Sequence, residues 1–129
     1  MPGKGHTVVH AHHTDALFQE SLSDYYLHVE GQVPLLYTEN ETNNQRLFGG
    51  QNASPYVKDA FHNRVVHGDA AAVNPAHTGS KMAAHHVLQV GAGATQVLRL
   101  RLTMRAPTPE TDAFADFDAV FAQRLAEAD

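Results

Sequence analysis

The sequence contains no cysteine. Disulfide bonds and thiolate chemistry, whether nucleophilic or metal-binding, are therefore excluded. Because proteins of reducing compartments do not depend on disulfides, this composition is consistent with a cytoplasmic protein, and we expect that location.

Long apolar runs and clustered positive charge are also missing. No run reaches the roughly 20 apolar residues that span a bilayer, and the first residues, MPGKGHTVVHAHH, lack the apolar core of a signal peptide. The nine Lys and Arg residues are mostly scattered, and the net charge is −5. We therefore expect neither a nucleic-acid partner nor a membrane partner.

Several catalytic signatures do not occur. The chain has no Gly-x-Ser-x-Gly elbow, no phosphate-binding glycine loop and no His-Glu-x-x-His motif. Its first 13 residues do hold four histidines, His6, His10, His12 and His13. Imidazoles two residues apart on a strand share a face, but a defined metal site needs three or four ligands held by a second shell. We expect no metal site and no cofactor.

Strand patterns occur in both halves of the chain, which at 129 residues is large enough for one domain with a modest core. Alternation predicts a strand over 25–29, and a second strand over 33–38 begins at a sheet edge because Pro34 cannot donate a ladder hydrogen bond. A short strand is expected near 61–67. The clearest hairpin pairs 82–90 with 98–102, with one apolar face and one wet face that carries arginines.

The C-terminal region is predicted to be a joint followed by a helix. Pro107-Thr108-Pro109 ends the preceding strand and stiffens the chain. Thr111 or Asp112 can cap a helix that follows. The helix carries an apolar stripe at three- and four-residue steps, Phe114, Phe117, Phe121, Leu125 and Ala128. This stripe must pack either on the sheet of this chain or on a missing domain.

The stretch from Leu35 to Lys81 is polar yet contains short apolar anchors. Ordered loops of this length are uncommon and usually functional. Its carboxylates, amides and cations are groups that bind hydroxyl-rich ligands, and Tyr37, Phe48 and Tyr56 supply aromatic faces. The alternative is a solvated loop network built on turn-forming Asn and Gly.

Several strings in this region and beyond it suggest a family. TENETNNQRLFG, NASPYVKD, VVHG and AVNPAHTGSKMAAHH occur in this order, and together they resemble bacterial members of the glucosidase group around glycoside hydrolase family 63. The resemblance runs from about Tyr25 to the C-terminus. It departs after the Lys-Asp pair, where Ala60, Phe61 and His62 stand in place of the expected Gly-Ile-Asn.

The resemblance implies a fold and a role. It implies a mainly β fold: an antiparallel β-sandwich portion with long ordered loops and a C-terminal α-helix. Residues 1–106 would form the sandwich portion, with a poorly defined start over 1–20, and 107–129 would lead towards a missing (α/α)6 catalytic domain. The chain would then be a non-catalytic part of a glucosidase that hydrolyses O-glycosides, with loop 38–64 forming a wall of the sugar site.

Five residues of that loop are candidates for contacts with sugar or with the other domain: Glu41, Asn43, Arg46, Lys58 and Asp59. The alternative role is loop-fixing, with Asp59 held by Lys58 or Arg64 and the amides capping turns. Glu39 and Glu41 are not a catalytic pair, because neighbours on one strand approach a sugar from the same side, whereas glycosidase carboxyls flank the scissile bond.

A second hypothesis is a free-standing β-rich module that binds sugar or has a structural role. Such a module should bury its helix stripe and unfold cooperatively. A fragment should leave the stripe exposed, because large apolar patches are rarely left open in complete proteins.

Overall fold

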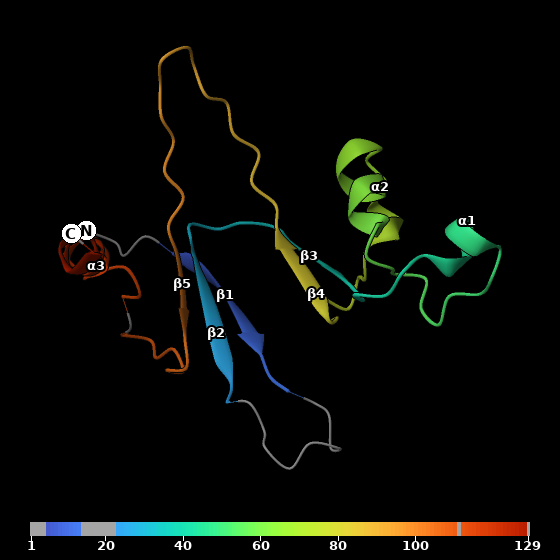
Figure 1. Ribbon diagram of the computed structural model, residues 1–129, viewed down its shortest axis with the longest axis horizontal. Coiled ribbons are helices and arrows are strands. Elements are labelled where there is room, and N and C mark those ends of the chain that lie inside the picture. The colour runs from blue at the N-terminus through green and yellow to red at the C-terminus, as the bar shows by residue number, and fades with distance from the viewer. Residues whose placement is uncertain (1–4, 14–22, 111, 129) are drawn as a thin grey trace. The chain divides into compact units, whose positions relative to one another are not determined.

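The computed structural model describes residues 5–13, 23–110 and 112–128. It divides into two compact units (Figure 1). Unit 1 is formed by the chain up to Val33 and again from Leu88 onward, and unit 2 by Pro34–Val87. Each unit is described separately below.

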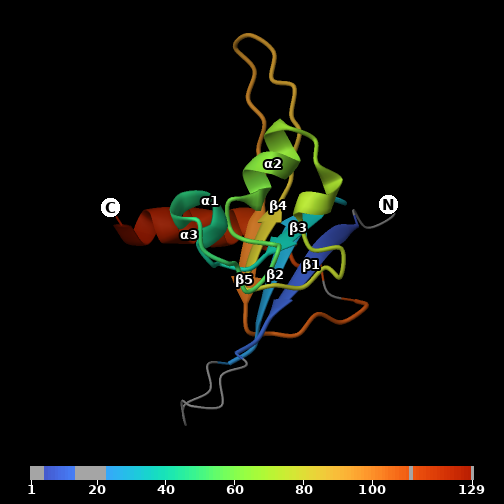
Figure 2. The same cartoon turned by 90° about the vertical axis from the view of Figure 1, so that its right-hand side faces the viewer.

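Unit 1 contains a three-stranded antiparallel sheet of β1 (His6–Ala11), β2 (Tyr25–Glu30) and β5 (Leu100–Thr103), with β2 in the centre. Figure 2 shows the three strands side by side. β2 confirms the strand predicted from alternation at 25–29. β1 lies within the first 20 residues, where the sequence pattern assigned no strand.

The predicted hairpin of 82–90 and 98–102 is wrong. β4 (Lys81–Ala84) pairs with β3 (Leu35–Thr38), whereas β5 pairs with β2. Residues 85–99 between them form no helix or strand. Alternation indicates that a segment is extended, but it does not specify which strand becomes its partner.

The two faces of the unit 1 sheet are also the reverse of that expectation. Leu100 and Leu102 of β5 are 48% and 63% exposed. The side chains of Arg99 and Arg101 on the opposite face are only 33% and 25% exposed. The arginine face is shielded because acidic and aromatic side chains from the C-terminal segment contact it.

Unit 2 is built on the two-stranded sheet β3–β4 together with α1 (Asn44–Phe48), α2 (Ala60–Val66) and the short 3-10 helix η1 (Ala70–Ala72). Leu36 and Thr38 of β3 are buried, as are Val57 and Ala60. The turn before β4 lies against β3: a side chain at Gly79 would collide with the Thr38 carbonyl oxygen. Glycine is therefore required for this close approach.

The short strand predicted near 61–67 is wrong, because these residues form most of α2. The apolar pieces Phe61 and Val65-Val66 favoured a strand, but apolar runs of this length do not distinguish strand from helix. Ala60 at the start of the helix is buried, and α2 packs against β3 and η1. Tertiary packing therefore outweighs the β preference of the two valines.

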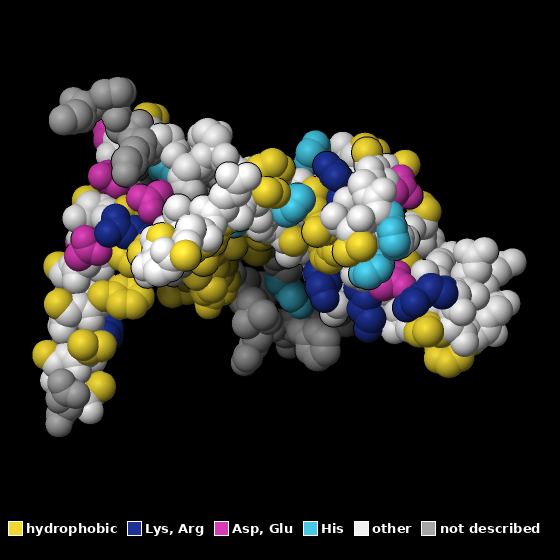
Figure 3. Space-filling view, turned by 90° about the horizontal axis from the view of Figure 1, so that it is seen from above, with side chains coloured by type: hydrophobic (Ala, Val, Ile, Leu, Met, Phe, Trp, Pro, Cys, Tyr) yellow, Lys and Arg dark blue, Asp and Glu magenta, His cyan; other side chains and the backbone are white. Residues whose placement is uncertain are grey.

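The predicted C-terminal helix is present as α3 (Phe117–Ala128). It begins later than the proposed caps: Thr111 lies outside the described residues, and Asp112 accepts a hydrogen bond from the Phe114 N–H in the turn before the helix. No residue of α3 is buried, and Phe121 and Leu125 are 60% and 69% exposed. Figure 3 shows hydrophobic side chains along this helix, at the left of the view.

The fold class is thus confirmed as antiparallel sheets with a C-terminal helix. Strands and helices occupy similar shares of the described residues, so "mainly β" overstates the strand content. The division at residue 106 and the sandwich architecture stay predictions. No helix among the described residues is long and apolar enough to cross a membrane.

Candidate functional site

Three of the five candidate residues meet at one carboxylate in unit 2. Arg46 Nε lies 2.8 Å from Asp59 Oδ2. Asn43 Nδ2 donates to both carboxylate oxygens, at 3.2 and 3.3 Å. The Asp59 side chain is 27% exposed, so its charge is partly desolvated and needs these partners. The three residues tie the start of α1 to the start of α2.

Asn43 also organises the loop that follows α1. Its Oδ1 caps the helix by accepting from Arg46 N at 3.1 Å, and it accepts from Asn52 Nδ2 at 3.0 Å. Asn52 Oδ1 in turn accepts from Gln45 N at 3.2 Å. The helix ends at Gly49, whose φ of 68° is the left-handed C-cap that glycine favours. An amide is needed at position 43, because one side chain must donate to a carboxylate and accept from two N–H groups.

The remaining two candidates contribute through their backbones. Lys58 N donates to the Glu41 carbonyl at 3.0 Å, and Glu39 N donates to the Tyr56 carbonyl at 2.7 Å. Both side chains, Glu41 and Lys58, are exposed, and neither has a hydrogen bond or ion pair with another of the described residues. The two segments lie side by side, and the buried Val57 lies between Tyr56 and Lys58.

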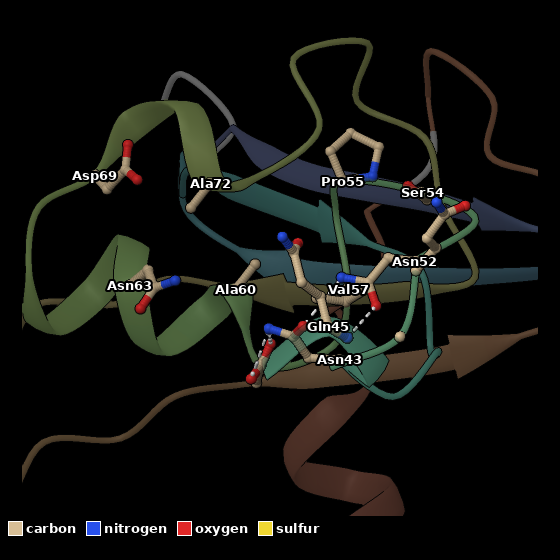
Figure 4. Close-up of a pocket in the computed structure, with 13 residues that line it drawn as sticks. Asn43, Gln45, Asn52, Ser54, Pro55, Val57, Ala60, Asn63, Asp69 and Ala72 are labelled. Carbon is tan, nitrogen blue, oxygen red and sulfur yellow. Dashed lines mark hydrogen bonds between the residues drawn. The ribbon is translucent and has the colours of Figure 1, made fainter. Parts of the chain in front are cut away.

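An open cavity of about 590 Å³ lies beside this network (Figure 4). It is lined by α1, the 50–57 loop, α2 and η1. Its lining residues are Asn43, Gln45, Gly50, Gln51, Asn52, Ser54, Pro55, Val57, Asp59, Ala60, Asn63, Asp69 and Ala72. Five of these side chains are amides and two are carboxylates, so the lining offers many donors and acceptors to a ligand.

The electrostatic character of the cavity is neutral to acidic. Asp59 is paired with Arg46, which does not itself line the cavity, and Asp69 Oδ1 accepts from Ala71 N at the start of η1. No Lys, Arg or His side chain among the described residues lines it. An anionic ligand would therefore face the Asp69 carboxylate and would meet no cation in the described lining, whereas a neutral polar ligand avoids this repulsion.

Predicted aromatic platforms are not part of this cavity. Tyr37, Phe48 and Tyr56 are absent from its lining. Phe48 is 76% exposed, and the Tyr37 ring makes an edge contact with His77, with centroids 6.0 Å apart. Burial raises the pKa of the Tyr37 phenol.

The structure also adds residues that the sequence analysis did not single out. Gln45, Gln51 and Asp69 line the cavity, and only their polarity within a long polar stretch pointed to them. Glu39, rejected as a catalytic carboxylate, accepts a hydrogen bond from Ser80 N at 3.2 Å and thereby fixes the turn before β4. This bond shows that at least part of the loop network has a structural role.

No metal centre is formed by the parts of the chain that the structure describes: no three His, Cys, Asp or Glu residues are grouped to hold an ion. Among the N-terminal histidines, His10 lies 3.1 Å from Asp24 and stacks on Tyr26 with ring centroids 4.7 Å apart. His6 instead contacts His28 of the neighbouring strand.

Comparisons with known proteins give one informative match. No family model matches this chain, and no solved structure matches it. The chain is similar to "Uncharacterized protein YMR196W" of Saccharomyces cerevisiae, with 35% identity over 107 residues. The alignment covers 74% of this chain and 10% of the yeast protein, so the chain spans about a tenth of the length of that relative.

Proposed function

We propose that this chain is a non-catalytic part of a larger glucosidase similar to glycoside hydrolase family 63, and that the cavity of unit 2 binds a neutral, hydroxyl-rich ligand. The observation that carries the ligand class is the lining of that cavity, in which amides and carboxylates gather without a cation. Its volume of about 590 Å³ falls within the ~300–1,000 Å³ range of small-molecule sites.

Sugars fit this lining for a chemical reason. Each hydroxyl group both donates and accepts, and an amide side chain offers both functions in one plane. Asn43 and Asp59 hold each other in place, and Asn52 is held by Asn43. Fixed polar groups lose little conformational entropy when a ligand binds, which favours recognition of a weakly binding neutral molecule.

In the larger enzyme, the catalytic carboxylates would belong to a helical barrel outside this chain. Strands of this chain would contribute to a β-sandwich portion beside that barrel, and the polar loop from 38 to 64 would form part of the sugar-binding wall. Glu41 and Lys58, whose side chains are exposed, are then available for contacts with sugar or with the catalytic domain. We expect the enzyme to act in the cytoplasm.

Titration of the isotope-labelled chain with glucose and maltose, followed by NMR, tests the binding proposal. Amide signals from residues 43–63 should shift for both sugars, and glucose 6-phosphate should bind more weakly than glucose. Gln45→Ala and Asn63→Ala should each weaken binding roughly fivefold, because a lost neutral hydrogen bond costs about 1 kcal/mol. Asn40→Ala removes an amide of the same unit that lies outside the cavity and should leave binding unchanged.

The result against this proposal is equally specific. Shifts that spread evenly over both units, or that the Asn40 variant reduces as much as the Asn63 variant, would show that the cavity is not the site. Tighter binding of the phosphorylated sugar would show that the ligand class is wrong.

The alternative proposal is a free-standing β-rich module. The exposed stripe of α3, with Phe121 at 60% and Leu125 at 69%, favours the larger protein instead. Sequencing the coding region on both sides of this reading frame distinguishes the two. Continuation into helical repeats with paired carboxylates supports the enzyme, and glycosidase activity of the extended protein then becomes the next measurement. Start and stop signals that bracket these 129 codons support the module.

A further inference from the structure

Two imidazole rings lie together on the shielded face of the unit 1 sheet. His28 of the central strand β2 is only 1% exposed, and its ring centroid lies 5.1 Å from that of His6 on β1. His28 Nδ1 and His6 Nε2 are both buried and have no hydrogen-bond partner among the described residues. Buried ring nitrogens without partners are unusual, and they mark a place where a proton has a large effect.

The segment that precedes α3 covers this pair. The Phe114 ring meets the His6 ring edge-on, with centroids 6.1 Å apart, and the neighbouring Ala113 is 4% exposed. Phe114 also contacts Phe117, the first residue of α3. The covering segment therefore consists of the residues from Ala113 to Phe117, and α3 continues from it.

Charged or titratable groups lie on each element packed there. On β1 this group is His10, whose Nε2 lies 3.1 Å from Asp24 Oδ2. On β2, Glu30 lies 3.8 Å from Arg99. On β5, Arg101 stands opposite His28 in the ladder. From the covering segment and α3, Asp116 pairs with Arg101 at 2.6 Å and Asp118 pairs with Arg99 at 3.0 Å. Asp116 and Asp118 are held by Arg101 and Arg99. Glu30 stands opposite His6 in the ladder, so a charge on His6 would face this carboxylate, whereas His28 stands opposite Arg101.

The neutral form of His28 is correspondingly favoured. The pKa of His28 is lowered from its ordinary value of 6.5, first by desolvation and then by the nearby His6 and Arg101. Protonation of His28 places a charge beside another imidazole and beside Arg101, on a side chain that is only 1% exposed. Displacing the covering segment would restore solvation.

We propose that the His6–His28 pair is an acid-sensitive latch: the neutral rings hold the segment 113–117 on the sheet, and protonation of the buried His28 releases this segment together with α3. The release would expose Phe114 and Phe117 and so extend the apolar surface that Phe121 and Leu125 already present on α3, for contact with another part of the protein. This inference does not depend on the sugar-binding proposal, because it concerns a different unit.

The direction with pH follows from linkage. In the closed state the pKa of His28 is lowered, and in the open state it returns to its ordinary value of 6.5. The opening equilibrium is therefore constant well above pH 6.5 and rises as pH falls through 6.5. It levels off below the lowered pKa, with a slope of up to tenfold per pH unit for this proton.

Asp116 does not act in the same pH window. Its pKa is lowered mainly by the hydrogen bond from Arg101. This ion pair therefore persists to lower pH, and the release below pH 6.5 is assigned to His28 rather than to Asp116.

Hydrogen exchange of the full chain between pH 7.5 and 5.0, corrected for intrinsic exchange rates, measures the latch. Protection of backbone amides in 113–120 should fall as the pH drops through 6.5. His6→Gln, a change on the half-buried edge strand, should flatten the pH dependence. The matched control is His67→Gln: His62 and His67 in unit 2 have ring centroids 5.1 Å apart but are exposed, so this variant should follow the original profile.

A pH titration of the unmodified chain followed by NMR tests the latch without any substitution. The latch requires that the imidazole signals of His28 and the amide signals of Phe114 and Phe117 change over the same pH range. A His28 that titrates while the segment 113–120 keeps its protection would overturn the proposal. An equal loss of pH dependence in the His67→Gln control would also overturn it.

Discussion

The two units use polar side chains in opposite ways. On the shielded face of unit 1, charged side chains form ion pairs such as Arg101–Asp116. Among the described residues of this face, buried ring nitrogens of His6 and His28 have no hydrogen-bond partner. In unit 2, one ion pair, Arg46–Asp59, fixes a frame of amides that lines an open cavity. The first arrangement responds to protons, and the second is suited to respond to neutral ligands. The comparison indicates that a polar side chain can serve a function when some of its hydrogen-bonding atoms have no partner within the protein. The number of polar side chains alone does not decide this.

The substitution expected to change the stability of one unit most, relative to the other, is at Gly79. A Gly79→Ala side chain would collide with the Thr38 carbonyl oxygen, so backbone must move. We expect a loss of roughly 2–3 kcal/mol in the stability of unit 2, which is typical of overpacking. Hydrogen exchange should show reduced protection of β3 and β4, with β1, β2 and β5 unchanged. Equal loss in both sheets would show that the two units unfold together.

Removal of Asp59 tests whether one carboxylate fixes the amide frame. Asp59→Ala leaves Arg46 and Asn43 without their shared partner, and we expect a loss of roughly 1–2 kcal/mol in unit 2 stability. Denaturant unfolding measures this loss. Glu41→Ala, whose exposed side chain has no such partner, is the control and should stay within about 0.5 kcal/mol. Similar values for both variants would contradict the proposed role of Asp59.

The two units should lose stability at opposite ends of the pH scale. Because the pKa of His28 is lowered, unit 1 should lose stability as pH falls below 6.5. Because burial raises the pKa of Tyr37 from 10.0, the unfolded chain loses this proton first, and unit 2 should lose stability as pH rises above 10. Thermal unfolding followed by unit-specific NMR signals measures both limits. Tyr37→Phe should remove the Tyr37 contribution at alkaline pH while leaving the acid limit of unit 1 in place.

The smallest effect is expected from salt. Sugar affinity in the cavity should be the same at low and high ionic strength, because the ligand carries no charge. Protection of the segment 113–117 should decline slightly as salt rises, since Asp116 and Asp118 are exposed partners of its ion pairs. A strong salt dependence of sugar binding would mean that charge, and not the amide lining, governs recognition.

Local patterns in the sequence identified several helices and strands. They failed where the structure depends on contacts between segments that are far apart in the sequence. Alternation located β2, and the three- and four-residue spacing of phenylalanines located α3, because both patterns are properties of a single segment. The hairpin prediction failed since β5 finds its partner more than 70 positions away in β2, as in the pairing of Leu27 with Leu102. Strand pairing is non-local, and the sequence pattern carried no information about it.

For the candidate site, too, the sequence indicated which residues are important but did not indicate all of their contacts. Asn43, Arg46 and Asp59 were identified because the polar types stood out in an ordered loop, and the structure brings the three together. Asp59 is fixed by Arg46 and Asn43, neither of which is the partner, Lys58 or Arg64, that the loop-fixing alternative named. Asp69 reaches the cavity only because η1 packs against α2, a tertiary contact that no local pattern indicated.

The leucines of β5 have a practical consequence. β5 is an outer strand of its sheet, and it presents Leu100 and Leu102 on the face opposite Arg101. Outer strands that expose apolar side chains can recruit further strands. Concentrated preparations of this chain should therefore self-associate through β5, and a single lysine at position 102 should keep it monodisperse for the measurements proposed above.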